Sequence, residues 1–444
     1  MQLKKRGYVK TAVATFAAAL LGSGAMAGAQ NSGIESSLLL YSETDRVKAA
    51  EGIVSYHREL SGGQGIGLKL TLDGLTGASP NGAAPTDRIQ TFTRPSGNGS
   101  YQAQPGEIPL DDTFKDTRFA LDGTFNQPLN RVTNLTLGGH FSGEHDYSSF
   151  GVNAGLTHDL FRRNTTVGLS ASFSHDVISP EGGAPIPLSS MVAARDDDGG
   201  EDDEHEGGES EFEGEDDDGE GGGSSKSKDV FDILAGFSQV LDRKTIFRFN
   251  YSYSHSSGYN NDPYKIVSIV QNESGDTPGD PLDYIYENRP DTRTKQALYG
   301  QLRRYLGGHT VDLSYRYFWD DWGITSHTVD FYFKWNFKGG QALQPHVRWY
   351  HQNQADFYRT YLVDGDPMPQ NVSADYRLAT YDGLTLGLQY SFPVAEGSRL
   401  SLSAEHYSQT GDRSPPEAIG VLNNYDLFPD MKVIMFRLGF SHDF

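Results

Sequence analysis

The pattern that most restricts the fold of this chain is an alternation of apolar and polar side chains, repeated in one segment after another. In residues 245–254, every second position is aromatic: Phe247, Phe249, Tyr251 and Tyr253. The positions between them are polar, and the same alternation recurs in residues 167–173, 311–319, 328–337 and 400–405. A repeat of two residues is typical of a strand with one apolar face. No amphipathic helical segment separates these runs, so together they predict a closed all-β structure.

Composition allows two classes of protein with such strands. The mean hydropathy of −0.54 is that of a soluble protein, yet the chain contains 24 Tyr, 24 Phe and 51 Gly. A membrane barrel combines these properties, because its strands expose apolar groups to lipid on one face only. A chain of 444 residues could also hold two or three soluble domains. Beyond the N-terminal segment, no apolar run reaches about eighteen residues, which excludes transmembrane helices.

The lengths of the connections favour a membrane barrel. We predict about sixteen strands, and every second connection is short, as near residues 130–131, 162–164 and 243–244. Short periplasmic turns and long outer loops are typical of outer-membrane barrels. Fourteen or eighteen strands are the alternatives if one run has been split or merged. The predicted strands span residues 34–43, 46–60, 65–76, 113–129, 132–145, 148–161, 165–178, 228–242, 245–257, 291–306, 309–320, 325–337, 342–353, 375–392, 397–409 and 431–444.

The N-terminus has the three parts of a secretory signal peptide in the required order. A basic segment ends at Lys10, an apolar run spans Thr11 to Leu21, and small residues follow. We expect cleavage after Ala27 or Ala29, so that residues 1–29 are removed and residues 30–444 form the barrel domain. The apolar run is too short to span a bilayer. The chain has no cysteine, and we expect Sec-type export to the outer membrane of a Gram-negative cell.

The C-terminal residues carry a second targeting pattern. The final strand alternates and ends in an aromatic residue, Phe444. Its order resembles the terminal strand signal read by the barrel assembly machinery, except that a hydrophobic residue is usual at the position of His442. The residues that make up this predicted assembly signal are Arg437, Gly439, Phe440, His442 and Phe444.

A strongly acidic segment, residues 195–228, separates two predicted strands. Sixteen Asp and Glu lie between Asp196 and Glu220, and they supply most of the net charge of −22. We expect this extracellular loop to be disordered, because it has too few apolar residues to bury a core. It is either a weak collector of divalent cations or a solvated loop that crosslinks lipopolysaccharide through such ions. The candidate cation ligands are Asp196, Asp197, Asp198, Glu201, Asp202, Asp203, Glu204, His205, Asp216, Asp217 and Asp218.

Alternation also assigns charged residues of both signs to the inner face of the barrel. Such a face lines either a mildly selective pore or an internal network of salt bridges in a plugged barrel. The predicted inner-face residues are Arg248, Asp312, Arg316, Asp330, Lys334, His346, Arg348, Glu405 and Arg437.

The chain shows no enzyme signature. It contains neither G-x-S-x-G nor H-E-x-x-H nor a phosphate-binding glycine loop. Ser326, His327 and Asp320 could be imagined as a triad, but we interpret them as turn residues and expect no catalytic residue and no resident cofactor apart from divalent cations. The negative charge is of the wrong sign for nucleic acid. The aromatic residues at strand ends predict an interfacial girdle; they include Trp319, Trp322, Trp335 and Trp349.

Six stretches of the chain resemble a family catalogued as domain of unknown function 3570, whose members are bacterial outer-membrane barrels. They are Leu75–Ala83, Asp111–Arg118, Ser257–Lys265, Tyr286–Asp291, Tyr315–Gly323 and Leu427–Asp430. The family has no settled activity, so the resemblance carries over no catalytic residue. It implies a link with proteins of envelope redox chemistry or metal handling. Several of the stretches fall in predicted outer loops, where they could pack into a cap that acts as a gate or as a binding surface.

These observations leave two functions open. The first is a channel or transport-associated barrel, for metal ions or small redox molecules. The second is a non-conducting structural or docking barrel whose acidic outer loops bind cations or a surface partner. An outer-membrane enzyme ranks last. In each case we expect the partners to be outer-membrane lipids, lipopolysaccharide and the barrel assembly machinery.

Overall fold

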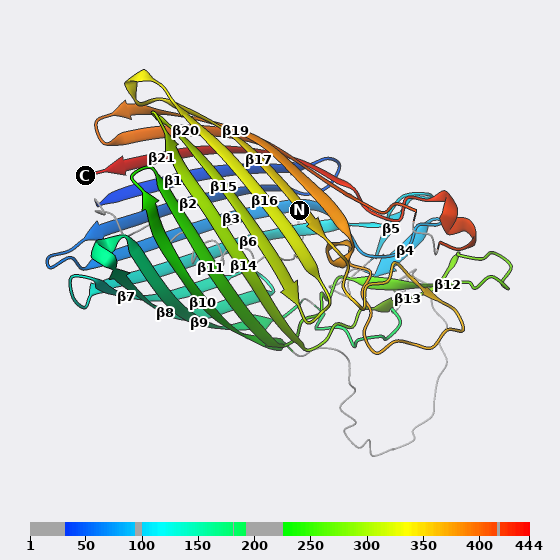
Figure 1. Ribbon diagram of the computed structural model, residues 1–444. Coiled ribbons are helices and arrows are strands. Elements are labelled where there is room, and N and C mark those ends of the chain that lie inside the picture. The colour runs from blue at the N-terminus through cyan, green and yellow to red at the C-terminus, as the bar shows by residue number, and fades with distance from the viewer. Residues whose placement is uncertain (1–31, 94–99, 181, 192–224, 415–417) are drawn as a thin grey trace, which may run out of the picture.

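One closed antiparallel sheet makes up most of the protein (Figure 1). The computed structural model describes residues 32–93, 100–180, 182–191, 225–414 and 418–444. Within them, sixteen strands follow one another around a barrel, and the last strand pairs with the first, from Gly33 opposite Asp443 to Glu43 opposite Val433. The barrel strands are β1 (Gly33–Glu43), β2 (Lys48–Glu59), β3 (Gly65–Pro80), β6 (Leu110–Pro128), β7 (Thr133–Gly143), β8 (Tyr147–Leu160), β9 (Thr165–Ile178), β10 (Lys226–Asp242), β11 (Thr245–Gly258), β14 (Thr292–Leu306), β15 (His309–Asp320), β16 (Thr325–Asn336), β17 (Ala342–Gln352), β19 (Tyr381–Ala395), β20 (Ser398–Gly411) and β21 (Met431–Asp443).

The predicted all-β barrel of sixteen strands is confirmed, but one predicted boundary is wrong. The strand predicted over residues 375–392 begins only at Tyr381. Before it, Asp375 accepts a hydrogen bond from the backbone N–H of Arg377 and so begins a 3-10 turn, η4 (Tyr376–Leu378). This local capping competes with the extended conformation, and it moves Asp375 and Arg377 out of the barrel wall.

Helical structure in the described residues is confined to short 3-10 turns. Besides η4, these are η2 (Phe161–Arg163), η3 (Lys338–Gly340) and η5 (Gly420–Asn424). No helix in this part of the chain is long and apolar enough to cross a membrane.

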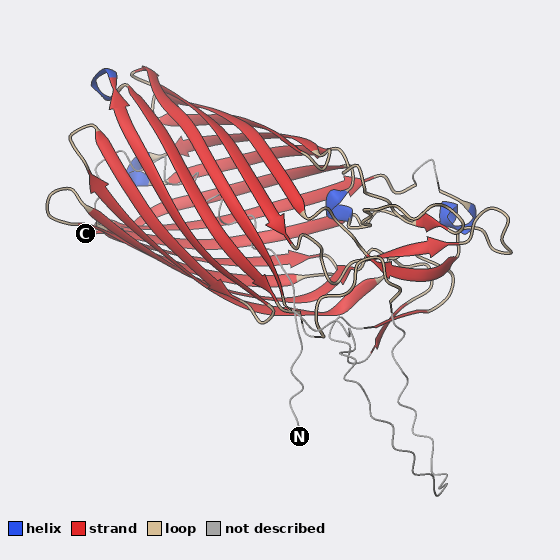
Figure 2. Ribbon diagram, turned by 90° about the horizontal axis from the view of Figure 1, so that it is seen from below, coloured by secondary structure: helices blue, strands red, loops and turns tan. Residues whose placement is uncertain are grey.

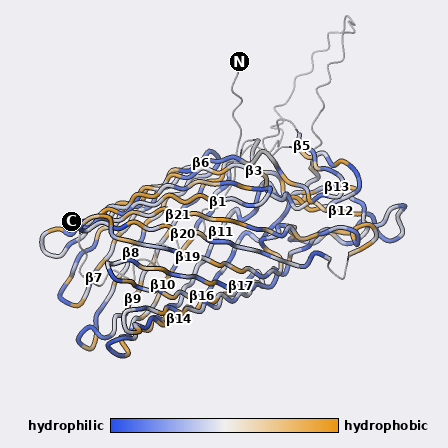
Figure 3. Tube along the Cα trace, turned by 90° about the horizontal axis from the view of Figure 1, so that it is seen from above, coloured by the Kyte–Doolittle hydropathy of each residue, from blue (hydrophilic) through white to orange (hydrophobic). Residues whose placement is uncertain are grey.

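Hydrophilic and hydrophobic residues alternate along the barrel strands (Figure 3). This alternation becomes a difference between the two faces of the barrel wall. On β21 the outer side chains Ile434, Phe436 and Leu438 are 50%, 55% and 42% exposed, whereas Val433, on the inner face, is 1% exposed. The inner face also buries small polar residues, such as Ser314 and Thr328. A wall that is apolar outside and polar inside fits a lipid environment, and the closed ladder leaves no strand edge without a hydrogen-bonding partner.

The two ends of the barrel differ, as Figures 1 and 2 show. At the end where the C-terminus lies, turns of two to five residues join the strands. At the opposite end, long connections carry two small sheets: the hairpin β4 (Gln90–Thr93) with β5 (Ser100–Ala103), and β12 (Ile266–Val270) between β13 (Pro281–Tyr286) and β18 (Leu362–Val363). We define the cap as the described residues of the long connections at this end that lie in the ranges 81–109, 182–191, 259–291, 353–380 and 412–430.

Candidate functional site

The cap has an apolar core of its own, although it is built from connections far apart in the sequence. Phe92, Val267 and Leu422 are fully buried there, in separate clusters that draw on different connections. Gly420, with φ of +50°, lies so close to the carbonyl of Pro278 that a Cβ would be 1.8 Å from its oxygen. Only glycine allows this approach of two cap segments. The outer loops therefore form a packed structure across one end of the barrel, rather than separate flexible loops.

Polar contacts attach the cap to the barrel wall at several points. On β17, the side-chain amide of Gln352 donates to the backbone carbonyls of Arg377 and Ala379, at 3.0 and 2.8 Å. Across the barrel, the Tyr264 hydroxyl donates to a carboxylate oxygen of Asp146, in the connection between β7 and β8. Burial and the nearby carboxylate of Asp146 raise the pKa of Tyr264 above its usual range, so this hydroxyl stays protonated and remains a donor.

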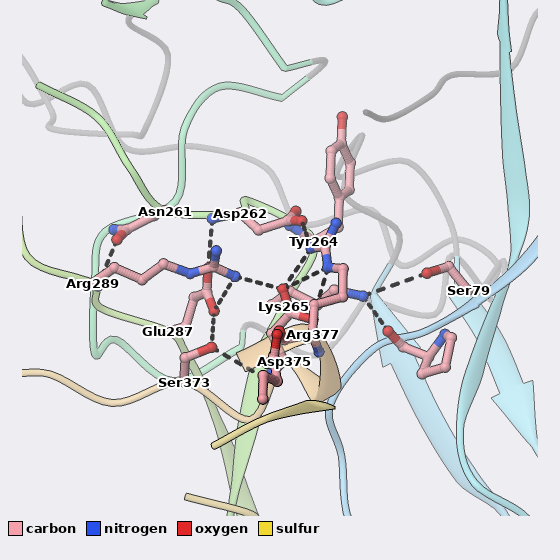
Figure 4. Close-up of polar contacts among 12 residues, drawn as sticks. Ser79, Asn261, Asp262, Tyr264, Lys265, Glu287, Arg289, Ser373, Asp375 and Arg377 are labelled. Carbon is pink, nitrogen blue, oxygen red and sulfur yellow. Dashed lines mark hydrogen bonds and ion pairs between the residues drawn. The ribbon is translucent and has the colours of Figure 1, made fainter. Parts of the chain in front are cut away.

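Six charged residues form a cluster within the cap, in which Arg377 is the most exposed member (Figure 4). Arg377 pairs with Asp375 at 2.9 Å and with Asp262 at 2.7 Å, and Arg289 bridges Asp375 at 2.8 Å and Glu287 at 2.9 Å. The three acids are Asp262, Glu287 and Asp375, and the three bases are Lys265, Arg289 and Arg377.

Asp375 lies at the centre of this cluster and is 1% exposed. Burial alone would raise its pKa, but Arg377, Arg289 and Lys265 outweigh that effect and hold the pKa of Asp375 below its usual range. Lys265 donates to the backbone carbonyl of Pro80 at the end of β3, so the same cluster also reaches the barrel wall. Because the acids and bases are equal in number, the cluster can be buried without a net charge.

A cavity of about 360 Å³ lies between the cap and the inner wall formed by β15, β16 and β17. From the wall, Arg316 and Arg348 line it, and Arg293 of β14 joins them. From the cap, Arg289 and Arg377 line it together with Asp375, the one acid of the lining. The cavity therefore has five guanidinium groups and a single carboxylate on its walls.

The structure brings four of the predicted inner-face residues together on the inner wall, and one of them, Arg348, also lines this cavity. His346 lies between Asp330 and Glu405, at 3.1 and 3.2 Å, and its ring stacks on Tyr332 with centroids 4.0 Å apart. Arg348 reaches Asp330 at 4.0 Å.

The other predicted inner-face residues do not join that group. Asp312 pairs with Arg303 at 2.6 Å, and Arg316 lies in the cavity. Within the described ranges, no ion pair forms at Arg248, Lys334 or Arg437.

The predicted assembly signal lies on the strand that closes the barrel. Gly439 faces Ser401 so closely that a Cβ would be 2.5 Å from its hydroxyl oxygen. Phe440 and Phe444 are exposed, and the His442 ring is 2.8 Å from the Ser398 hydroxyl. Arg437 is paired in register with Leu39 on β1 and Ser403 on β20.

Two interpretations of aromatic and polar residues are corrected by the structure. Trp322 is not an interfacial residue: it is buried against Phe357 in a cluster that includes cap residues, because the tight turn after β15 folds inward. Ser326 and His327, interpreted as turn residues, lie in the strand β16. Ser326 lines the cavity, whereas His327 is 2.7 Å from the hydroxyl of Tyr315, an outward residue.

Two other predictions lie outside the described residues: the cleavage sites Ala27 and Ala29, and the acidic segment up to residue 224. The end of that segment is described, and Lys226–Lys228 belong to β10 rather than to a loop. In the part of the chain that the structure describes, no group of three or more His, Asp and Glu is placed to hold a metal ion.

The sequence indicated part of this site. Asp262, Glu287 and Arg289 belong to stretches expected to pack into a cap, and Arg316 and Arg348 were assigned to the inner face by alternation. Asp375 and Arg377 are not indicated by the sequence, because the predicted strand over residues 375–392 includes them. The short spacing Asp375-x-Arg377 was the one available signal, since such a pair can cap a turn.

A closed barrel of sixteen strands, with an apolar outer face and turns much shorter at one end than at the other, defines the class of outer-membrane β-barrels. The chain belongs to the DUF3570 family, described as a protein of unknown function, whose family model matches residues 10–442. The resemblance noted from the six sequence stretches is therefore confirmed.

Solved structures with a similar barrel are distant in sequence. The siderophore receptor PirA from Acinetobacter baumannii is 10% identical with a TM-score of 0.41, and the match covers 86% of this chain and 53% of the receptor. The outer membrane protein OpdK from Pseudomonas aeruginosa is 10% identical with a TM-score of 0.39, covering 93% and 99%. A bacterial polysaccharide outer membrane secretin is 9% identical with a TM-score of 0.43, covering 93% and 98%.

The chain thus spans about half the length of the siderophore receptor. No curated protein matches the chain significantly. Similarity this distant says nothing about what the chain transports or binds.

Proposed function

We propose that this protein is a transport barrel of the outer membrane and that its cap controls passage through the barrel. The observation that supports this most directly is the construction of the cap. It has its own apolar core and its own neutralised charge cluster, and both lie across one mouth of the barrel. Loops that served only to stiffen strand ends would not need a shared core.

Polar contacts between cap and wall, such as the hydrogen bonds from Gln352 and from Tyr264, can be exchanged for water. The apolar clusters around Phe92 and Val267 lie within the cap, and one further apolar cluster, around Trp322 and Phe357, joins the cap to the turn after β15. The cap can therefore move as one body while its interior stays packed, which is how packed elements commonly rearrange.

Removing one attachment point should make the barrel open more often. Tyr264→Phe deletes the hydrogen bond to Asp146, and a hydrogen bond to a charged group contributes roughly 1.5–3 kcal/mol. In planar bilayers we expect rare, brief openings from the wild-type protein. The variant should have an open probability higher by about tenfold, which corresponds to roughly 1.4 kcal/mol.

The matched control is Tyr251→Phe. Tyr251 donates to Gln296 between β11 and β14, in the wall and away from the cap, so its loss should leave the openings unchanged. If neither the wild-type protein nor Tyr264→Phe conducts, the transport proposal fails. The result would then favour the non-conducting docking barrel.

We also propose that the acidic segment collects divalent cations outside the barrel. Its sixteen carboxylates are oxygen donors of the kind that hard cations prefer, and it connects β9 to β10 at the cap end. Calorimetric titration with Ca²⁺, Cu²⁺ and Fe²⁺ should detect several weak sites, with dissociation constants on the order of 10⁻³ M. Deleting residues 196–220 should remove most of them. Equal affinity in both proteins would contradict this role. Of the two cargo classes expected from the sequence, small redox molecules suit the arginine-lined cavity better than metal cations do.

A further inference from the structure

We propose that the cavity beneath the cap binds a small organic anion, and that Arg316 and Arg348 hold its carboxylate or phosphate group. This inference deepens the proposed function and rests on it, because it assigns a cargo class to the passage under the cap. Arginine presents a planar fork of N–H donors that matches these oxyanions, so a cavity lined by five arginines selects for them.

Not all five arginines are available to a ligand. Arg289 and Arg377 are engaged in the cap cluster, and Arg293 pairs with Asp320 at 2.6 Å while its guanidinium lies over the Trp322 ring. These three are therefore neutralised by acids of the protein itself. They shape the cavity and add little attraction for an anion.

Arg316 and Arg348 are different. In the described chain, Arg316 has no carboxylate within 4.0 Å, and the nearest acid to Arg348 is Asp330 at 4.0 Å, which is already engaged with His346. Arg316 on β15 is paired with Thr328, and Thr328 with Tyr350, two residues beyond Arg348 on β17. Both arginines thus reach one region of the inner wall, where an anion would supply the missing partner.

The rest of the lining indicates an organic anion rather than an inorganic one. Phe318 and Ile324 on the wall side, and Leu378 on the cap side, give the cavity an apolar flank. Ser326 and Thr328 add hydroxyl groups that can donate to ligand oxygens. The volume, about 360 Å³, is within the range of roughly 300–1,000 Å³ that is typical of small-molecule sites.

Binding to the purified full-length protein in detergent tests the inference, with phthalate and phenyl phosphate as probes and benzyl alcohol as their neutral counterpart. Calorimetry should show binding of at least one anionic probe and none of the alcohol. The probe that binds more tightly identifies the group recognised, carboxylate or phosphate. Arg316→Gln should weaken its binding by about tenfold or more, as expected for the loss of a charge-assisted hydrogen bond.

Arg248→Gln is the matched control, because Arg248 lies outside the cavity, and it should bind as the wild type does. Arg316→Lys should recover part of the affinity, since the charge returns without the fork. Heat-modifiable migration on gels verifies that each variant is folded. If no anionic probe binds, or if Arg316→Gln binds as tightly as the wild type, the inference is overturned. In that case, channel openings that become more frequent in Tyr264→Phe would still support the transport proposal. Conversely, anion binding by a protein that shows no channel openings would contradict the transport proposal but not the anion site.

Discussion

Replacing Asp375 with alanine is expected to release the cap from its folded state. Asp375 is 1% exposed and neutralises both Arg289, at 2.8 Å, and Arg377, at 2.9 Å. Its loss would leave the guanidinium group of Arg289, whose side chain is 10% exposed, and the more exposed Arg377, together with buried Lys265, with only Asp262 and Glu287. Breaking a buried ion pair by removing one partner typically costs about 3–5 kcal/mol, because the remaining charge stays desolvated. We expect the cap to lose that much stability, while the barrel stays folded.

Limited proteolysis can measure the opening of the cap separately from unfolding of the barrel, which heat-modifiable migration reports. The control is Asp426→Ala. Asp426 also pairs with an arginine, Arg413 at 3.5 Å, but its side chain is 63% exposed. Exposed pairs contribute about 0–1 kcal/mol, so this variant should be cut as slowly as the wild type. Equal rates for Asp375→Ala and Asp426→Ala would show that the cluster does not hold the cap.

The same residue gives a pH dependence with a definite sign. The arginines hold the pKa of Asp375 in the folded protein below the value of about 3.9 that it has when unfolded. Its stabilising effect is therefore complete above that unfolded value and is lost as the pH falls through the lowered folded value. Between neutral pH and about pH 4, titration of Asp375 should therefore not increase the rate at which the wild-type cap is cut by protease.

Leu388→Arg is expected to have a comparable effect on the barrel itself. Leu388 is at the middle of β19, faces outward and is 48% exposed. An arginine on the lipid face at the bilayer midplane costs about 2–4 kcal/mol, and near the interface about 0–1 kcal/mol.

Val394→Arg provides the control on the same strand, at the bulge between Pro393 and Ala395. Val394 is 50% exposed but lies one residue from the end of β19, beside the short turn. Denaturant unfolding from lipid vesicles should show a clear loss of stability for Leu388→Arg and little for Val394→Arg. Similar losses for both would mean that the apolar face is not embedded as the alternation indicates.

The barrel could be predicted from sequence because its main signal is local. A strand with one apolar face needs only alternation, as in residues 245–254, and each strand pairs with its neighbours in the chain. The lengths of the connections then distinguish one end of the barrel from the other. These signals do not depend on contacts between distant residues, so the strand order can be predicted from the sequence.

The cap could not be predicted in the same way. In sequence, Asp375 and Arg377 resemble the start of a strand. In the fold they lie beside Asp262 and Arg289, which are more than eighty residues away in the chain. In sequence, Trp322 resembles an interfacial residue, whereas in the fold its turn packs against Phe357. Alternation assigned Arg316 and Arg348 to the inner face, but the cavity also needs Arg377 from the cap. These arrangements depend on packing between segments, which the local pattern does not contain.

The mixed origin of the cap core has a consequence for how this protein matures and diverges. Its clusters combine residues from as many as four connections, so no single outer loop buries enough apolar surface to fold alone. The barrel must form first and bring the strand ends together. Only then can the outer segments pack against one another. A change in the length of any one of them would disturb its neighbours. These surface segments should therefore vary as a set during evolution, unlike the independent outer loops usual on a barrel.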